Sequence, residues 1–186
     1  DCGGHFSAEM IIDAGGFRSV LAQQFNLRTR NQQTHSRGIF THMIGVLPAP
    51  DGDYGLPFAM HEGTLHHVFD GGWLWVIPFN NFDGATNPVT SVGLMLDSRR
   101  YPQDSSISAE TEFFRFIERF PSIHNQLRAA SATRSWVRAP RLQYGSRQVV
   151  GDRWALLGHA VGFIDPLYSK GLYISMTSVF VLAHQL

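Results

Sequence analysis

Several residues and motifs that would point directly to a function are scarce or missing in these 186 residues. There is one cysteine, Cys2, which excludes an internal disulfide bond and a cysteine-based zinc site. Charged residues make up 16% of the chain and the net charge is zero, which argues against nucleic acid or an anionic membrane as partners. The single cysteine and the lack of a signal peptide favour a cytoplasmic protein.

Long apolar runs and ligand motifs are missing too. The longest apolar run, from Gly171 to Leu186, is interrupted by polar residues and is too short for a membrane span. No Gly-Xaa-Gly-Xaa-Xaa-Gly fingerprint follows a predicted strand. His66 and His67 point to opposite faces of their strand and have no partners at metal-ligand spacing, so we predict no metal site. Because the chain begins without Met and stops inside an apolar helix, we expect a fragment.

What the sequence does contain is a series of short strands separated by turns. The clearest hairpin pairs residues 63–69 with residues 73–79 through the turn Asp70-Gly71-Gly72. Residues 89–96 predict a third neighbouring strand, so we expect an antiparallel meander with one face free to cover a ligand. The loops 48–57 and 80–88 are expected to shape a pocket beside it.

From Ser108 onward the spacing of apolar residues changes to that of an amphipathic helix. Ser108 is placed to cap a helix whose apolar face includes four phenylalanines, and Pro121 ends it. Short helices are predicted at 19–25 and 122–130, and a long one after Gly171. Further strands are predicted at 5–12, 38–47, 134–138, 143–150 and 154–157. The fold class is therefore α+β, with roughly eight strands and four helices.

The most informative stretch runs from Trp154 to Gly171. A buried strand leads into a loop that contains Gly158 and Gly162, and the loop opens the final helix. Glycine lets a backbone approach a ligand closely, and the first N–H groups of a helix can receive an anion. The pattern predicts a ligand loop, although an ordinary strand–loop–helix connection has the same elements.

The residues of this stretch resemble the glycine segment of the FAD-dependent monooxygenase superfamily in the form found in flavin-dependent halogenases. Ten positions agree in register: Leu157, Gly158, Ala160, Gly162, Phe163, Ile164, Asp165, Pro166, Ser169 and Gly171. The turn Asp13-Ala14-Gly15-Gly16 resembles the family's turn beside the cofactor. The segment from Gly72 to Pro78 resembles the family's Gly-Trp-Xaa-Trp-Xaa-Ile-Pro signature. The resemblance covers essentially the whole chain.

The resemblance implies a p-hydroxybenzoate-hydroxylase-like fold that is incomplete here. It assigns residues 1–30 and 151–186 to an FAD-binding α/β domain and residues 31–150 to a mainly antiparallel substrate domain. It implies FAD as the cofactor, reduced by a separate flavin reductase in a halogenase. The cofactor-binding residues it implies are Asp13, Gly16, Gly158, His159, Gly162, Phe163, Ile164, Asp165, Pro166 and Gly171.

The same resemblance implies roles in catalysis. In the family, a flavin C4a-hydroperoxide oxidises halide or an organic substrate. Trp73 and Trp75 would separate that species from the substrate, although both could also be core residues. The residues implied to face a halide are Ser169, Lys170 and Gly171. Lys170 is the single lysine and would add positive charge there, unless it simply faces solvent.

One departure from the family pattern concerns the cofactor. His159 stands where the family has an aspartate that binds FAD hydroxyls, and a histidine accepts fewer hydrogen bonds than a carboxylate. FAD binding could therefore be weakened, or His159 could donate to the pyrophosphate. Asp13 could serve only its own turn.

Three functions remain open from the sequence. The first is an FAD-dependent halogenase acting on a small-molecule or carrier-tethered aromatic substrate. The second is a flavin hydroxylase, or a reductase of a lipid or polyketide. The third is a non-catalytic remnant that binds a small molecule.

Overall fold

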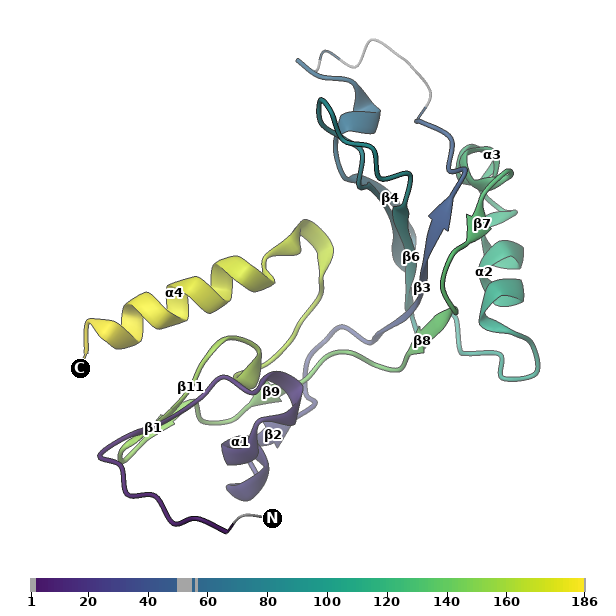
Figure 1. Cartoon of the computed structure of the whole chain (residues 1–186). Coiled ribbons are helices and arrows are strands. Elements are labelled where there is room, and N and C mark those ends of the chain that lie inside the picture. The colour runs from purple at the N-terminus through teal and green to yellow at the C-terminus, as the bar shows by residue number, and fades with distance from the viewer. Residues whose placement is uncertain (1–2, 50–54, 56, 186) are drawn as a thin grey trace. The chain divides into compact units, whose positions relative to one another are not determined.

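The computed structural model describes residues 3–49, 55 and 57–185. Cys2, Leu186 and most of the predicted loop 48–57 therefore lie outside the described residues. The chain divides into two compact units (Figure 1). Unit 1 contains residues 1–34 and 142–186, and unit 2 contains residues 35–141.

Unit 2 is built on a six-stranded antiparallel sheet in the order β4-β5-β6-β3-β7, with β8 also paired to β3. The strands are β3 (Ser36–Ile44), β4 (Leu65–Phe69), β5 (Gly72–Pro78), β6 (Thr90–Asp97), β7 (Ser131–Ala132) and β8 (Val137–Ala139). Gly71 has φ +82°, as the tight turn between β4 and β5 requires. The predicted antiparallel meander is thus confirmed, and the fold class is the expected mixed one.

Two helices cover one face of this sheet, α2 (Ala109–Ile117) and α3 (Pro121–Leu127) (Figure 1). The Ser108 hydroxyl accepts a hydrogen bond from the Thr111 N–H at 3.0 Å, so the predicted cap is confirmed. Pro121 does more than end α2, because it is the first residue of α3, where its missing N–H costs nothing. The core between sheet and helices contains Ile39, Leu74, Val76, Leu94, Phe113, Ile117 and Leu127, among others.

A charged cluster lies beside this core. Glu112 of α2 bonds Arg37 at 2.5 Å and Arg138 at 2.7 Å. The Glu112 and Arg37 side chains are only 10% and 5% exposed, so two arginines share one carboxylate with little water present. Such a group ties β3, β8 and α2 together.

Unit 1 holds a small sheet in which β1 (Ile11–Asp13) runs parallel to β11 (Trp154–Leu156), with β10 (Val150–Gly151) antiparallel on its other side. A second pair joins β2 (Arg28–Thr29) to β9 (Gly145–Ser146). The remaining short elements are α1 (Val20–Gln24) and the 3₁₀ turns η1 (Gly16–Arg18), η3 (Gly158–Ala160) and η4 (Leu167–Ser169), while η2 (Met60–Glu62) belongs to unit 2.

Three predicted boundaries in unit 1 need correction. The strand predicted at 5–12 is confined to 11–13, because only these residues have a partner, in β11. The strand predicted at 143–150 is two short pieces, β9 and β10, which pair with different neighbours. Those pairings also group residues 142–150 with unit 1, whereas the sequence placed them with the substrate sheet.

Helix α4 (Gly171–Ala183) is the last helix of the described residues (Figure 1). None of its residues is buried. Apolar side chains face outward on more than one side, with Leu172 75% and Phe180 64% exposed. No helix within residues 3–185 is both long and apolar enough to cross a membrane.

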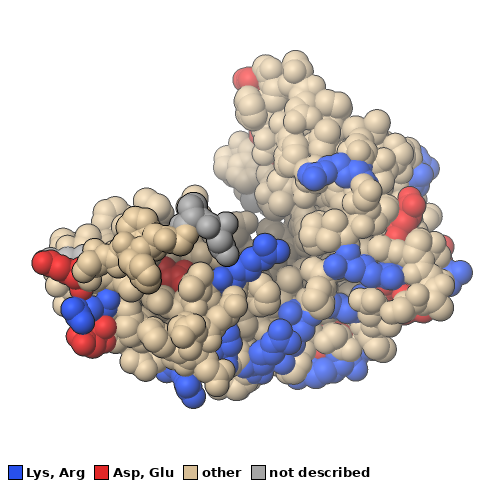
Figure 2. Space-filling view, turned by 60° about the horizontal axis from the view of Figure 1, so that its bottom comes forward, with Lys and Arg blue, Asp and Glu red and all other residues tan. Residues whose placement is uncertain are grey.

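The charged side chains are dispersed. Figure 2 shows separate groups of Lys and Arg on the face in view, with uncharged surface and acidic groups between them. Several arginines point their donors at backbone carbonyls, as Arg37 does at Tyr101 and Arg138 at Ile107. The arginine-rich composition therefore contributes to internal hydrogen bonding.

Candidate functional site

The loop from Gly158 to Gly171 leaves β11 and packs its first turn tightly against α4. Gly158 has φ +51°, and a Cβ there would lie 2.6 Å from the Ser175 hydroxyl. The Gly158 N–H donates to the Ser178 hydroxyl at 3.2 Å. Only glycine fits this approach, which in this structure is made to Ser175 of α4.

Tyr144 anchors the middle of the loop. Its backbone exchanges hydrogen bonds with Phe163 at 3.0 and 2.8 Å, and its hydroxyl donates to the His159 carbonyl at 2.8 Å. A Cβ on Gly162 would lie 2.8 Å from the Tyr144 carbonyl oxygen. Burial raises the pKa of the Tyr144 phenol, with Arg28 opposing the rise, so the hydroxyl remains a donor.

Arg28 joins the two segments that the sequence assigns to the cofactor. Its guanidinium donates to the Ala160 carbonyl at 2.7 Å and to the Gly16 carbonyl at 2.9 Å. It also lies 4.6 Å from the centroid of the Tyr144 ring. Together with the Leu157 N–H, which donates to the Asp13 carbonyl at 2.9 Å, this contact brings the 13–16 turn and the glycine loop side by side.

Arg28 and Tyr144 were not predicted as site residues. Arg28 lies in a polar stretch of the sequence, and its bond to Ala160 spans 132 residues. The available signal was a cation and an aromatic flanking the two glycine segments, which is too general to single them out.

Both carboxylate oxygens of Asp13 accept hydrogen bonds from residues that follow it within its own turn and α1. One carboxylate oxygen accepts the Gly15 N–H, and the other accepts the Ser19 hydroxyl and the Leu21 N–H, all at 2.8 Å. Burial alone would raise the pKa of Asp13, but the donors from Leu21, Gly15 and Ser19 outweigh it and lower the pKa below 3.8. Gly16 next to this turn has φ +64° and open space where a Cβ would stand.

We expect Asp13→Asn to cost about 1 kcal/mol of stability at neutral pH, because the amide keeps only one accepting oxygen. Since the folded pKa is lowered, the wild-type contribution is complete above pH 3.8 and is lost as the pH falls through the folded value. Urea unfolding at pH 7 and pH 3 measures this, and the gap between wild type and variant should narrow at pH 3. Exposed Asp152→Asn is the control, and an equal loss there would contradict the assignment.

His159 is exposed and lies at the start of α4. Its ring contacts the Phe163 ring edge-on, with centroids 5.2 Å apart. A Cβ on Gly171 would lie 2.9 Å from the His159 ring, so glycine at 171 makes room for the imidazole. The ring atoms therefore face outward beside the first N–H groups of α4.

The remaining loop residues form a strained turn. Asp165 accepts the Leu167 N–H at 2.9 Å, and the Pro166 carbonyl accepts the Ser169 N–H at 2.9 Å. The Ser169 N–H, predicted to face a halide, is thus used inside the turn. Tyr168 and Ser169 both have positive φ, +64° and +51°, which non-glycine residues rarely adopt. Lys170, Ile164 and Ser169 are exposed.

Trp73 and Trp75 belong to unit 2 and stand on the sheet face opposite the helices. Their centroids are 5.5 Å apart, and the side chains of Leu74 and Val76 between and beyond them enter the core. The Trp75 indole donates to the Ser91 hydroxyl at 3.1 Å and lies directly over Gly93. The pair thus faces one side, as predicted.

His66 and His67 confirm the predicted opposite orientation. His66 contacts the Trp73 ring at 5.3 Å, whereas His67 bonds Gln126 on the core side. Within the described ranges, no group of three or more metal-binding side chains occurs.

Comparison with known proteins agrees with this geometry. The profile of the tryptophan halogenase family matches residues 1–186. The chain is 48% identical over 172 residues to tetracycline 7-halogenase of Kitasatospora aureofaciens, and 50% identical over 188 residues to monodechloroaminopyrrolnitrin halogenase PrnC of Pseudomonas fluorescens. These matches cover 89% and 99% of this chain but 31% and 33% of the relatives. The chain thus spans about a third of their length.

A solved halogenase structure is similar to this chain as well. Halogenase PltM, crystallised with phloroglucinol and FAD, superposes with a TM-score of 0.88 at 38% identity, covering 98% of this chain and 37% of PltM. The chain belongs to the tryptophan halogenase family.

Proposed function

We propose that this chain forms the flavin-facing loop and substrate-side sheet of an FAD-dependent halogenase, an oxidoreductase that places a halogen on an aromatic small molecule. The observation that carries the proposal is the match along all 186 residues, together with the likeness to PltM in its complex with phloroglucinol and FAD.

The residues of unit 1 fit a flavin nucleotide. The open space at Gly16 allows close approach of a ligand, and the outward His159 ring offers a donor. FAD would supply the redox chemistry when bound, while the protein supplies position and exclusion of water. The loop residues Gly158, Phe163, Ile164, Asp165, Pro166 and Gly171 would line it.

His159 is proposed to donate to the anionic or hydroxylated part of FAD. An imidazole at this position cannot replace a carboxylate as an acceptor, but it can act as a donor. Its exposed ring beside the first helical N–H groups supports that role, because both offer donors to the same partner.

Lys170 and Gly171 are proposed to receive the halide, and Ser169 to shape the turn that presents them. The first hydrogen bond of α4 runs from the Ile174 N–H to the Lys170 carbonyl, so the N–H groups before it have no helical acceptor. The ammonium group of Lys170 adds a positive charge at this end of the helix.

Trp73 and Trp75 are proposed to wall the path to the substrate. The substrate is proposed to be an aromatic small molecule, free or carrier-tethered, and reduced FAD would come from a separate flavin reductase in the cytoplasm. Relatives named for tetracycline and for monodechloroaminopyrrolnitrin support a small-molecule substrate.

The test uses the complete gene product with FAD, a flavin reductase, NADH and phloroglucinol as probe acceptor. We expect a product with the chlorine isotope pattern that depends on chloride. Lys170→Met should raise the chloride concentration for half-maximal rate about two- to fivefold, with bound FAD unchanged. Arg128→Met, which removes an exposed charge in unit 2, is the matched control.

The alternatives give different results. A hydroxylated product formed without halide would favour a flavin hydroxylase. Failure to retain FAD would favour a non-catalytic remnant. An unchanged chloride dependence in Lys170→Met would remove Lys170 from the halide site without touching the flavin assignment.

A further inference from the structure

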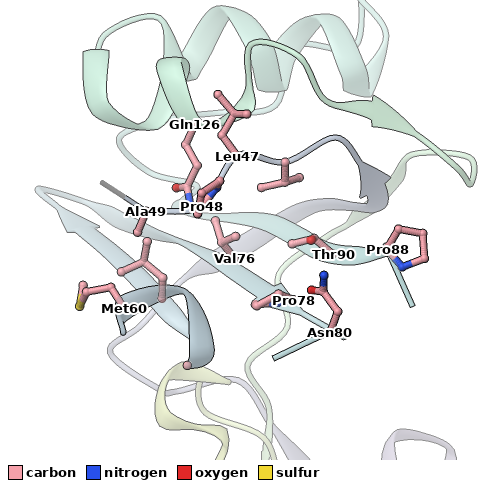
Figure 3. Close-up of a pocket in the computed structure, with 13 residues that line it drawn as sticks. Leu47, Pro48, Ala49, Met60, Val76, Pro78, Asn80, Pro88, Thr90 and Gln126 are labelled. Atoms are coloured by element: carbon pink, nitrogen blue, oxygen red, sulfur yellow. The ribbon is translucent and has the colours of Figure 1, made fainter. Parts of the chain in front are cut away.

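Unit 2 contains a pocket at the end of its sheet. It has a volume of about 160 Å³ and is enclosed by the ends of β4, β5 and β6, the segment after β3, and α3 (Figure 3). The loops that the sequence expected to shape a pocket both contribute, through Pro48 and Ala49 on one side and Asn80 and Pro88 on the other. Most of its lining residues are apolar, while polar and apolar atoms contribute about equally to its surface.

Gln126 of α3 gives the pocket an unpaired donor. The residue is 6% exposed, and its side chain lines the pocket (Figure 3). Its Oε1 lies 3.0 Å from Nε2 of His67, and its backbone carbonyl accepts the Leu47 N–H at 2.9 Å. The amide nitrogen has no hydrogen-bond partner among the residues that the structure describes.

His67 sets the orientation of this amide. Burial lowers the pKa of His67, with the Gln126 bond opposing, so the ring is neutral near pH 7. A neutral ring with Nε2 facing Oε1 carries its proton on Nε2 and donates it. The amide N–H groups are then free to donate to an acceptor on the pocket side.

The volume limits what can enter. A cavity of about 150 Å³ holds one benzene molecule, so this pocket accommodates a single ring. Ligand pockets combine apolar walls with a few polar groups that orient the ligand, and here Gln126, Thr90 and Asn80 are those groups. Met60, Leu47 and Val76 provide the apolar surface.

We propose that this pocket binds a monocyclic aromatic compound bearing a carbonyl or phenol oxygen, and that the Gln126 amide donates a hydrogen bond to that oxygen. The site lies wholly within unit 2. Ligand binding at this site requires no flavin, so it can be tested separately from the proposed halogenase activity.

The test uses ligand-observed and protein-observed NMR on this chain with three probes. Acetophenone has the ring and the acceptor, toluene has the ring alone, and 2-acetylnaphthalene has one ring too many. We expect acetophenone to bind about three- to tenfold more tightly than toluene, the effect of one hydrogen bond. We expect no binding of 2-acetylnaphthalene.

Gln126→Glu supplies the decisive variant, because the carboxylate still accepts from His67 but offers no donor to the ligand. Acetophenone should lose its advantage over toluene, while Asn125→Asp, the same change on the exposed side of α3, should behave as wild type. In the wild type, addition of acetophenone should shift the side-chain amide resonances of a single glutamine. Equal binding of acetophenone and toluene, unaltered acetophenone binding in Gln126→Glu, or no shifted glutamine amide would each overturn the proposal.

Discussion

Replacing Glu112 with leucine is expected to lower the free energy of unfolding by about 3–5 kcal/mol, the usual cost of removing one partner from a buried ion pair. The carboxylate is shared by Arg37 and Arg138 at 2.5 and 2.7 Å. Without it, two guanidinium groups keep their charge beside the core and lose their counter-ion. Urea unfolding of the chain, followed by circular dichroism, measures the change.

Glu110→Leu is the matched control for this prediction. Glu110 lies two residues before Glu112 on the same helix but is exposed, so the same substitution should change stability by about 0.5 kcal/mol or less. If both variants lost the same stability, the cause would be α2 itself, and the ion cluster would contribute nothing measurable.

Gly93→Ala is expected to lower stability by about 1–3 kcal/mol and to displace the Trp75 indole. A Cβ at position 93 would lie 2.0 Å from the Trp75 ring, far inside contact distance. The ring must then move off the sheet, which breaks its hydrogen bond to Ser91. Urea unfolding gives the stability, and the indole N–H resonance of Trp75 reports the lost hydrogen bond.

Gly63→Ala provides the comparison, since the nearest atom to a Cβ there is 3.8 Å away, on Phe58, and the backbone has φ −111°. Its stability should stay close to that of the wild type. An unmoved Trp75 resonance in Gly93→Ala would show that the indole does not rest on Gly93.

Local signals predicted the parts of the fold that local chemistry determines. The Asp70-Gly71-Gly72 turn and the Ser108 cap both act within a few residues, and both are where the sequence placed them. Pairing over long distances was not predictable in the same way. Strand β3 pairs with β6, β7 and β8 at once, and no turn motif joins it to any of them.

The candidate site shows the same division. The glycines at 158 and 162 could be identified because only glycine allows the backbone contacts found there. Arg28 and Tyr144, which hold the loop, could not be identified from the sequence, because their partners lie far away along the chain. A cation and an aromatic residue near two glycine segments are too common to single them out. The pocket donor on Gln126 depends on the orientation imposed by His67, which no spacing encodes.

Helix α4 has a consequence for how the chain behaves in water. Its outward Leu172, Tyr173 and Phe180 form an apolar surface with no charged residue between Gly171 and Ala183 to keep two copies apart. Such surfaces promote association between molecules. Colloidal stability should therefore fall steeply with protein concentration, and light scattering should rise before any unfolding begins.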